Sequence, residues 1–223
     1  MASKEPLNGN ARGADGLWPQ SDYEKMGMGS ANLYLVYSMF TFVLGSPGAV
    51  AAVVAIFVMP CAAVLDKIAL IKSYDLAPLY FILAALQFTM LLINANLGTA
   101  RRPTRVNVPD QHVYKVYGGA GDSALVFMHD DAEFGKFNRA QRALANFEET
   151  LPLLIAQALA MAFIFPWATL ACVVVLGIFR VKGAVDYTTE RMKRMTGNMA
   201  ANALANSFFT ANLVIGIAAL VKA

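Results

Sequence analysis

The sequence predicts an all-α membrane protein, in which a four-helix transmembrane bundle follows an extra N-terminal helix. Hydrophobic residues make up 57% of the chain and charged residues only 15%, whereas a soluble domain is about a quarter charged. Several apolar runs approach the roughly 20 residues that cross a bilayer as a helix. No segment shows the apolar and polar alternation of a membrane β-barrel, so the runs are interpreted as helices.

Residues 1–30 differ from the rest of the chain, because they are rich in Gly, Asn and Asp and contain no apolar run. A secretory signal needs an apolar stretch of about 7–15 residues, and a mitochondrial transit peptide is poor in acidic residues such as Asp15 and Asp22. We therefore predict a flexible polar tail over 1–30, with Trp18 and Tyr23 available to dock on a partner or at the membrane interface.

Residues 31–72 contain the extra membrane helix, and two interpretations of it compete. Ala49–Leu65 is apolar but short for a span, and Leu33–Leu44 before it is also apolar. Gly45-Ser46-Pro47-Gly48 lies between them and is expected to break or kink a helix. One interpretation is a single kinked span from Asn32 to Leu65. We favour the other, a span over Ala49–Leu65 preceded by an interfacial segment.

Residues 73–223 are predicted to form the bundle. Its four helices are Leu76–Leu97, a helix entered after Lys136 that is uncharged from Thr150 to Phe165, Trp167–Thr189 beyond the Pro166 turn, and Met199–Val221. In the last helix, Gly197, Ala201 and Ala205 form a small-residue row beside an amide row of Asn198, Asn202 and Asn206. Both rows favour close helix packing in lipid.

Basic residues concentrate in two loops that this topology places on one side of the membrane. The loops contain Arg101, Arg102, Arg105, Lys115 and Lys136, and then Arg191, Lys193 and Arg194. Lys and Arg enrichment predicts that both loops face the cytosol. The net charge is only +3 and no basic run carries interleaved aromatics, so a nucleic-acid partner is excluded.

Two polar stripes at this end carry the candidate chemistry. Arg139, Arg142, Asn146 and Glu149 are spaced three, four and three apart, and therefore share one helical face. A second stripe is formed by Arg180, Tyr187, Arg191 and Arg194 if that helix continues past Glu190. Charged side chains within membrane helices are costly, which makes them functional candidates by default.

Arg180 follows the apolar run Val173–Phe179, and Glu149 is its expected partner. This pair either only fixes helix packing or helps to line a cationic cavity that opens toward the cytosol, with Arg101, Arg102 and Arg105 at its mouth. Guanidinium groups bind carboxylates through paired hydrogen bonds. The cavity therefore predicts a small polar anionic ligand, with an apolar co-substrate that arrives from the lipid.

The string Phe137-Asn138-Arg139-Ala140-Gln141-Arg142-Ala143, followed by Asn146, Glu149 and Pro152, resembles the Arg-Ala-x-x-Asn-x-x-Glu signature of one family. This is the MAPEG family, the membrane-associated proteins in eicosanoid and glutathione metabolism. Ala100-Arg101-Arg102 is similar to the cationic end of that family's first helix, and Arg180, Tyr187 and Arg194 are similar to its third helix and loop. The resemblance covers Leu76–Val221 and is greatest to the type-3 microsomal glutathione S-transferases.

The resemblance implies a four-helix bundle assembled as a homotrimer, with glutathione as co-substrate held between adjacent subunits. It implies that Arg142, Asn146, Glu149 and Tyr187 bind glutathione, and that Arg101 lies near its carboxylates. Arg180 is assigned to the same binding site. Arg194 takes the position of the catalytic arginine, which stabilises the thiolate. A nearby guanidinium lowers a thiol pKa, and the thiolate is the nucleophile.

Three positions depart from the family pattern. Gly183 replaces a glutathione-binding tyrosine, Thr150 replaces a larger or aromatic residue, and Leu144 replaces a polar one. Two functions therefore compete. One is a glutathione transferase or peroxidase of the endoplasmic reticulum or another organelle membrane, mitochondria and plastids included, that acts on lipophilic electrophiles or lipid hydroperoxides. The other is a catalytically degenerate accessory subunit of a larger membrane complex, docked through the extra helix.

Overall fold

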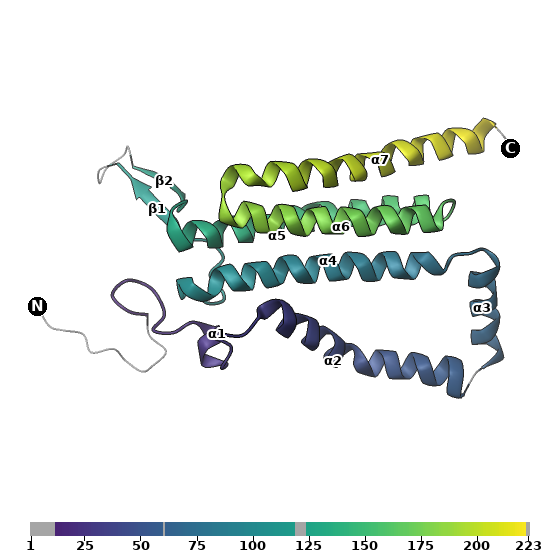
Figure 1. The fold of residues 1–223 in the computed structure, drawn as a ribbon, viewed down its shortest axis with the longest axis horizontal. Coiled ribbons are helices and arrows are strands. Elements are labelled where there is room, and N and C mark those ends of the chain that lie inside the picture. Colours follow the sequence, from purple (N-terminus) through teal and green to yellow (C-terminus); the bar gives the residue numbers. More distant parts are fainter. Residues whose placement is uncertain (1–11, 60, 119–123, 222–223) are drawn as a thin grey trace, which may run out of the picture.

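The computed structural model describes residues 12–59, 61–118 and 124–221, and these form an elongated bundle with a helical frame along one side (Figure 1). The elements in chain order are α1 (Asp22–Lys25), α2 (Leu33–Val53), the π-helical turn η1 (Val54–Val58), α3 (Ala62–Ser73), α4 (Ala77–Arg101), the 3-10 turn η2 (Arg102–Thr104), β1 (Tyr114–Tyr117), β2 (Leu125–Met128), α5 (Ala132–Ala162), α6 (Pro166–Thr189), the 3-10 turn η3 (Arg191–Lys193) and α7 (Arg194–Val221).

Helices α4, α5, α6 and α7 run side by side and enclose the core. The largest fully buried side chains include Ile82, Phe137, Phe147, Leu176 and Phe208, which come from all four helices. Pro166 occupies the first position of α6, where a missing backbone N–H costs least. The predicted four-helix bundle is therefore confirmed, and its two basic loops lie at the same end (Figure 1).

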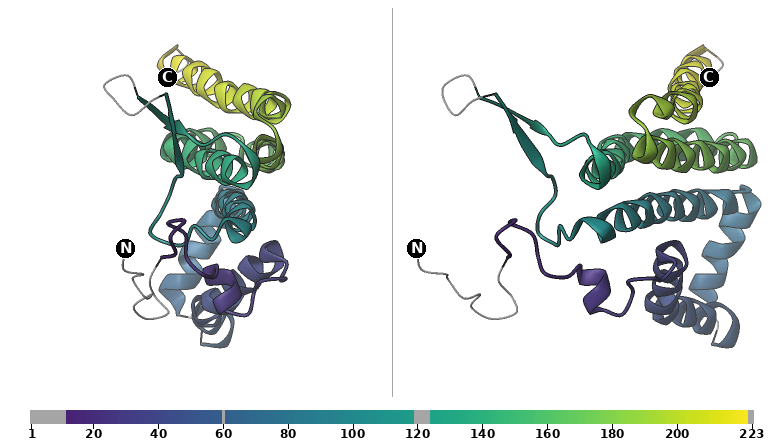
Figure 2. Two further views of the ribbon diagram at one scale, coloured as in Figure 1. Left: turned by 90° about the vertical axis from the view of Figure 1, so that its left-hand side faces the viewer. Right: turned by 60° about the vertical axis from the view of Figure 1, so that its left-hand side comes forward.

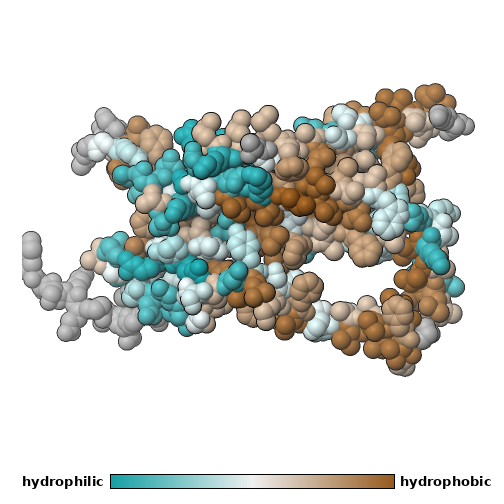
Figure 3. Space-filling model, viewed as in Figure 1, coloured by the Kyte–Doolittle hydropathy of each residue, from teal (hydrophilic) through white to brown (hydrophobic). Residues whose placement is uncertain are grey.

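The exterior of the bundle has the composition of a membrane protein. Four helices are long and apolar enough to cross a bilayer: Leu33–Val58, Ala77–Thr104, Pro166–Thr189 and Arg191–Val221. Helix α5 carries charges along its first half, and its second half is apolar. Polar residues gather mainly at the end that carries the loops, and apolar residues cover most of the remaining surface (Figure 3). The chain is an integral membrane protein.

The extra N-terminal helix differs from the favoured prediction. The helix is continuous over Leu33–Val58 and passes through Pro47, so a span over Ala49–Leu65 is wrong. Pro47 has no N–H to donate to the carbonyl of Val43, four residues earlier. The helix continues because Ser46 Oγ donates to this carbonyl instead, at 2.7 Å. It ends at Met59, which precedes Pro60 and leaves the helical region with φ −129°.

Helix α3 is a separate element that joins the far end of α2 to the start of α4. Figure 1 shows α2 diverging from α4 along its length, with α3 crossing between their ends. In the 18-residue core of the α2 span no residue is buried within the chain. Helices α2 and α3 therefore form an open frame beside the bundle, and α2 is held mainly at its beginning.

Residues 12–30 differ from the expected flexible tail, because they are bound to the end of the bundle. Ser21 is fully buried and forms a capping box with Glu24. The amide of Asp22 donates 2.9 Å to Asn107 Oδ1, and Arg102 Nη1 donates 2.7 Å to the carbonyl of Ala31. The tail prediction for residues 1–11 lies outside the described residues.

Strands β1 and β2 form an antiparallel hairpin in the loop between α4 and α5, in the register Tyr114↔Met128 to Tyr117↔Leu125. The hairpin projects from the loop end of the bundle in all three views (Figures 1 and 2). All eight strand residues are exposed, and seven of them are large and hydrophobic. The hairpin is therefore an apolar element without a core of its own.

Candidate functional site

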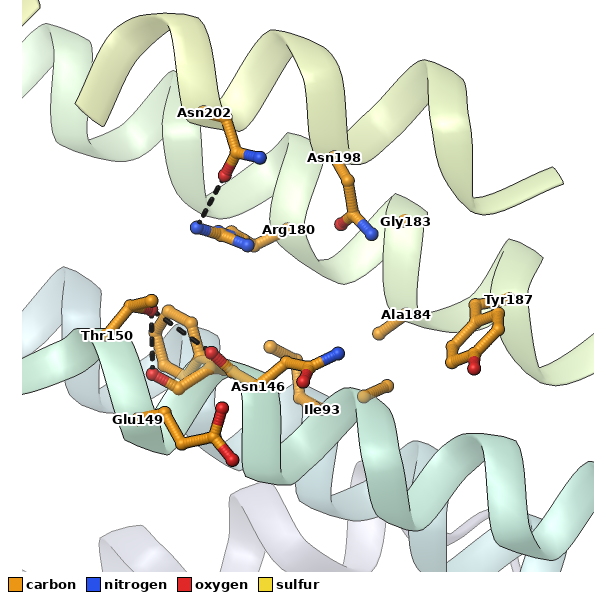
Figure 4. Close-up of a pocket in the computed structure, with 12 residues that line it drawn as sticks. Ile93, Asn146, Glu149, Thr150, Arg180, Gly183, Ala184, Tyr187, Asn198 and Asn202 are labelled. Atoms are coloured by element: carbon orange, nitrogen blue, oxygen red, sulfur yellow. Dashed lines mark hydrogen bonds between the residues drawn. The ribbon is translucent and has the colours of Figure 1, made fainter. Parts of the chain in front are cut away.

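A polar cavity of about 260 Å³ lies between α5, α6 and α7 near the loop end (Figure 4). Four residues of the predicted site line it: Asn146, Glu149, Arg180 and Tyr187. The other lining residues are Ile93, Ala143, Phe147, Thr150, Gly183, Ala184, Asn198 and Asn202. Both polar stripes of the sequence therefore contribute residues to this cavity, and the remaining residues of each stripe lie outside it.

Helical spacing explains which side chains reach the cavity. Asn146 and Glu149 are three residues apart on α5, and Arg180 and Tyr187 are seven apart on α6, so each pair projects from one face. Helix α7 completes the wall because Gly197 allows it to approach α6 closely. A Cβ on Gly197 would lie only 2.6 Å from the Gly183 nitrogen. The small-residue row is thus confirmed as a packing surface.

Arg180 does not bind Glu149, so the predicted pair is wrong. Arg180 Nη2 donates 2.9 Å to Asn202 Oδ1 on α7 (Figure 4). Its buried Nε has no hydrogen-bond partner among the described residues. Glu149 instead accepts from Arg142 Nη1 at 3.1 Å on its own helix. The helical spacing brought both charges to the cavity, but α7 supplied a nearer partner for the guanidinium.

The ion pair of Arg142 and Glu149 is exposed, with 46% and 58% of the two side chains accessible. Exposed pairs are worth little free energy, so a ligand can compete for either partner at small cost. Arg142 does not line this cavity with Glu149, but lines the neighbouring hollow instead.

His112 is a further titratable group affected by this arginine. Burial lowers the pKa of His112, and the positive charge of Arg142 lowers that pKa further.

Arg194 lies near the cavity, but it belongs to α7 and not to a continuation of α6. Helix α6 ends at Thr189, so the second stripe is not continuous, and Arg194 begins α7 instead. Its guanidinium nevertheless lies 5.3 Å from the centre of the Tyr187 ring. A cation over an aromatic face at this distance is attractive. Arg194 is therefore placed beside a residue that lines the cavity.

Arg101 lies apart from the cavity within the single chain. Its Nη1 donates 2.8 Å to the carbonyl of Asp110, its Nη2 approaches Gln141 Oε1 at 3.4 Å, and its guanidinium stacks 4.8 Å from the Phe137 ring. Arg102 and Arg105 are also occupied, by the Ala31 carbonyl and by Asp15. The expected arginine mouth is therefore not formed within one chain.

The sequence favoured packing over ligand binding for Asn198 and Asn202, and both side chains line the cavity. Asn198 also explains how Gly183 is accommodated. A Cβ on Gly183 would lie 2.5 Å from Asn198 Oδ1, so the amide fills the direction in which a tyrosine at 183 would project. The signal in the sequence was an amide row that starts directly after a basic loop.

The fold and the cavity together define an integral membrane protein with a four-helix bundle and a polar pocket between three helices near its loop end. The family model described as MAPEG family matches residues 79–218, which begin in α4 and end in α7. The match covers more than half of the chain, and the chain belongs to the MAPEG family. The comparisons with curated proteins and with solved structures gave no match.

Proposed function

We propose that the protein is a glutathione-dependent membrane transferase or peroxidase, similar to the type-3 microsomal glutathione S-transferases. The observation that supports this most strongly is the meeting of Asn146, Glu149, Arg180 and Tyr187 in one polar cavity of a MAPEG bundle. Its substrates are lipophilic electrophiles or lipid hydroperoxides, which concentrate in the surrounding bilayer. We place the protein in the endoplasmic reticulum or another organelle membrane, with the basic loops in the cytosol.

Each side chain has a defined role in this proposal. The guanidinium groups of Arg142 and Arg180 bind glutathione carboxylates, Glu149 binds its amino group, and the amide of Asn146 bonds to its peptide groups. Arg194, beside Tyr187, stabilises the thiolate by favouring the charged form of the thiol. The thiol proton leaves to water, and the sulfur electron pair then forms the new C–S bond as the leaving group departs with its own pair.

In the proposed homotrimer, glutathione lies between adjacent subunits, and Arg101 approaches its carboxylates from the neighbouring subunit. The position of Arg101 apart from the cavity of its own chain supports this arrangement. Its carbonyl partners are backbone groups of the same loop, so they hold the guanidinium at the bundle end. The proposed assembly unit is the bundle domain, 73–223, with 31–72 as the extra membrane helix region and 1–30 as the N-terminal tail.

The test is the glutathione thiolate absorbance of detergent-purified protein, followed by conjugation of a model electrophile. Wild-type protein should show the thiolate band and form conjugate. Arg194→Ala should lose most of both signals while still binding glutathione, and Lys193→Ala, one residue away, should retain them. A wild-type protein that neither binds glutathione nor forms conjugate would show that the proposal is wrong.

A second function, an accessory subunit of a larger membrane complex, is favoured by a separate observation. Gln87 and Asn94 lie seven residues apart on α4 and are exposed toward the frame. Neither amide side chain has a hydrogen-bond partner among the described residues, and unpaired amides are unfavourable in lipid. A partner helix beside α2 would satisfy them. Co-migration with a large complex on a native gel would support this function, and migration as a trimer alone would oppose it.

A further inference from the structure

A second hollow, of about 480 Å³, lies next to the polar cavity on the loop side. It is walled by the hairpin on one side and by α5 and the end of α6 on the other. Its lining residues are Tyr117, Phe127, Met128, His129, Asp130, Asn138, Arg139, Arg142, Tyr187 and Arg191. We call this second hollow the vestibule. Because Tyr187 lines both hollows, a molecule in the vestibule would lie directly beside the proposed glutathione site.

The vestibule carries an excess of positive charge, with three guanidinium groups against the carboxylate of Asp130. Arg139 is already neutralised, because it is mostly buried and bonds to Asp130 and to the carbonyls of Tyr187 and Thr188. Arg191 is exposed and has no hydrogen-bond or ion-pair partner among the described residues. Arg142 holds only the exposed pair with Glu149. Because the proposed function assigns Arg142 to glutathione, Arg191 is the guanidinium group of this hollow that is available to a second anion.

The opposite wall of the vestibule is aromatic. The rings of Tyr117 and Phe127 lie 6.1 Å apart in a tilted arrangement, with Met128 beside them. Phe127 is 55% exposed and Tyr117 is 42% exposed. An isolated two-stranded hairpin is only marginally stable in water, and it gains stability when something covers its apolar face. A flat apolar group inserted between the hairpin and α5 would provide that cover.

We propose that the vestibule binds an amphipathic organic anion, with an aromatic body against Tyr117 and Phe127 and an acid group at Arg191. Resting on the proposed function, this molecule is an electrophilic co-substrate with an acid group, which stays at the aqueous loop end, in addition to the lipophilic substrates that arrive from the bilayer. Its reactive carbon lies toward Tyr187, where the two hollows meet. A pocket of this size with a few convergent polar groups is typical of small-molecule sites.

The test is binding of the non-reactive acid 4-(3-oxobutyl)benzoate to full-length protein in lipid nanodiscs, measured by equilibrium dialysis without glutathione. Empty nanodiscs correct for partition into lipid. Wild-type protein should bind the acid saturably and bind the neutral analogue 4-phenyl-2-butanone at least tenfold more weakly. Arg191→Gln and Phe127→Ala should each raise the Kd of the acid about tenfold, the loss of about one strong contact.

Two variants control for long-range charge and for hairpin folding. Lys193→Gln removes the same charge two residues away but outside the vestibule, and Val126→Ala shortens an exposed hairpin residue that does not line it. Both should leave the Kd of the acid unchanged. Absence of saturable binding, or equal affinity in Arg191→Gln, Phe127→Ala and the two controls, would overturn the proposal.

A parallel glutathione titration of the same samples separates this inference from the proposed function. Intact glutathione binding with no acid site overturns the vestibule proposal alone. An acid site that depends on Arg191 and Phe127 in a protein that does not bind glutathione supports the anion site and overturns both the co-substrate role and the proposed function.

Discussion

The N-terminal frame and the four-helix bundle have similar apolar sequences but very different packing. In the α2 span none of the 18 window residues is buried within the chain, whereas a third of the corresponding window is buried in both α4 and α6, and 6% in the outer helix α7. Lipid solvates apolar side chains as well as a protein core does, so hydropathy alone does not specify which helices pack together. Close backbone approach and polar contacts make the difference.

The two regions use these contacts in different places. In the bundle, Gly197 meets Gly183 and Arg180 bonds to Asn202, so α6 and α7 are joined along the site. Among the described residues, the side-chain hydrogen bonds that α2 makes to other elements lie near its beginning. There, Tyr34 donates to Asn96, and Tyr37 bonds to Tyr23 over Gly98, whose lack of a side chain makes room for both hydroxyls. The bundle is therefore built around a site, and the frame is attached beside it.

The largest expected effect comes from forcing α6 and α7 apart. Gly197→Leu would place a side chain against the Gly183 backbone and the Phe179 carbonyl, and should destabilise the bundle by about 1–3 kcal/mol. Gly216→Leu is the matched control, since nothing lies within 4 Å of its Cβ position. Unfolding of detergent-solubilised protein would measure both. Equal stability of the two variants would contradict the packing described for α6 and α7.

A smaller effect is expected from cutting the link between the frame and the bundle. Asn96 is buried, donates 2.8 Å to Thr188 Oγ1 and accepts from Tyr34. Asn96→Leu should cost about 1–2 kcal/mol, the range for amide bonds between membrane helices in model peptides. Asn94→Leu, which replaces an exposed amide with no partner among the described residues, should be neutral or stabilising. The same unfolding assay compares them, and the opposite ranking would argue against the proposed attachment.

The smallest effect on stability is expected inside the site. Asn202→Leu removes the partner of Arg180 Nη2 and should cost about 0.6 kcal/mol, the average for such bonds in a membrane protein. It should also weaken glutathione binding severalfold, because Arg180 loses its orientation. Asn206→Leu, one turn further along α7 and outside the polar cavity, should leave the affinity unchanged. A glutathione titration of both variants checks this, and equal loss in the two would exclude a specific role for Asn202.

Sequence reasoning found the elements whose signals are local. The uncharged runs predicted α4 and α7, Pro166 marked the turn before α6, and the spacing of Asn146 and Glu149 predicted their common face. It also found the family, since residues 79–218 match the MAPEG model.

The failures came from contacts that depend on neighbouring groups. Pro47 does not break α2, because the Ser46 hydroxyl satisfies the carbonyl that Pro47 leaves free, so the span begins at Leu33 and not at Ala49. Glu149 was paired with Arg180 on the basis of opposite charge, and α7 brought Asn202 closer. Partners of this kind are set by how helices cross, which the spacing along one helix does not specify.

The most direct test of the central claim is an isothermal titration of glutathione into nanodisc-embedded wild-type, Glu149→Gln and Glu148→Gln proteins. Glu149 lines the polar cavity, whereas its neighbour Glu148 is exposed and lies outside it. We expect saturable binding to the wild type, an affinity about tenfold lower for Glu149→Gln and no change for Glu148→Gln. No binding to the wild type, or equal affinities for all three proteins, would contradict it.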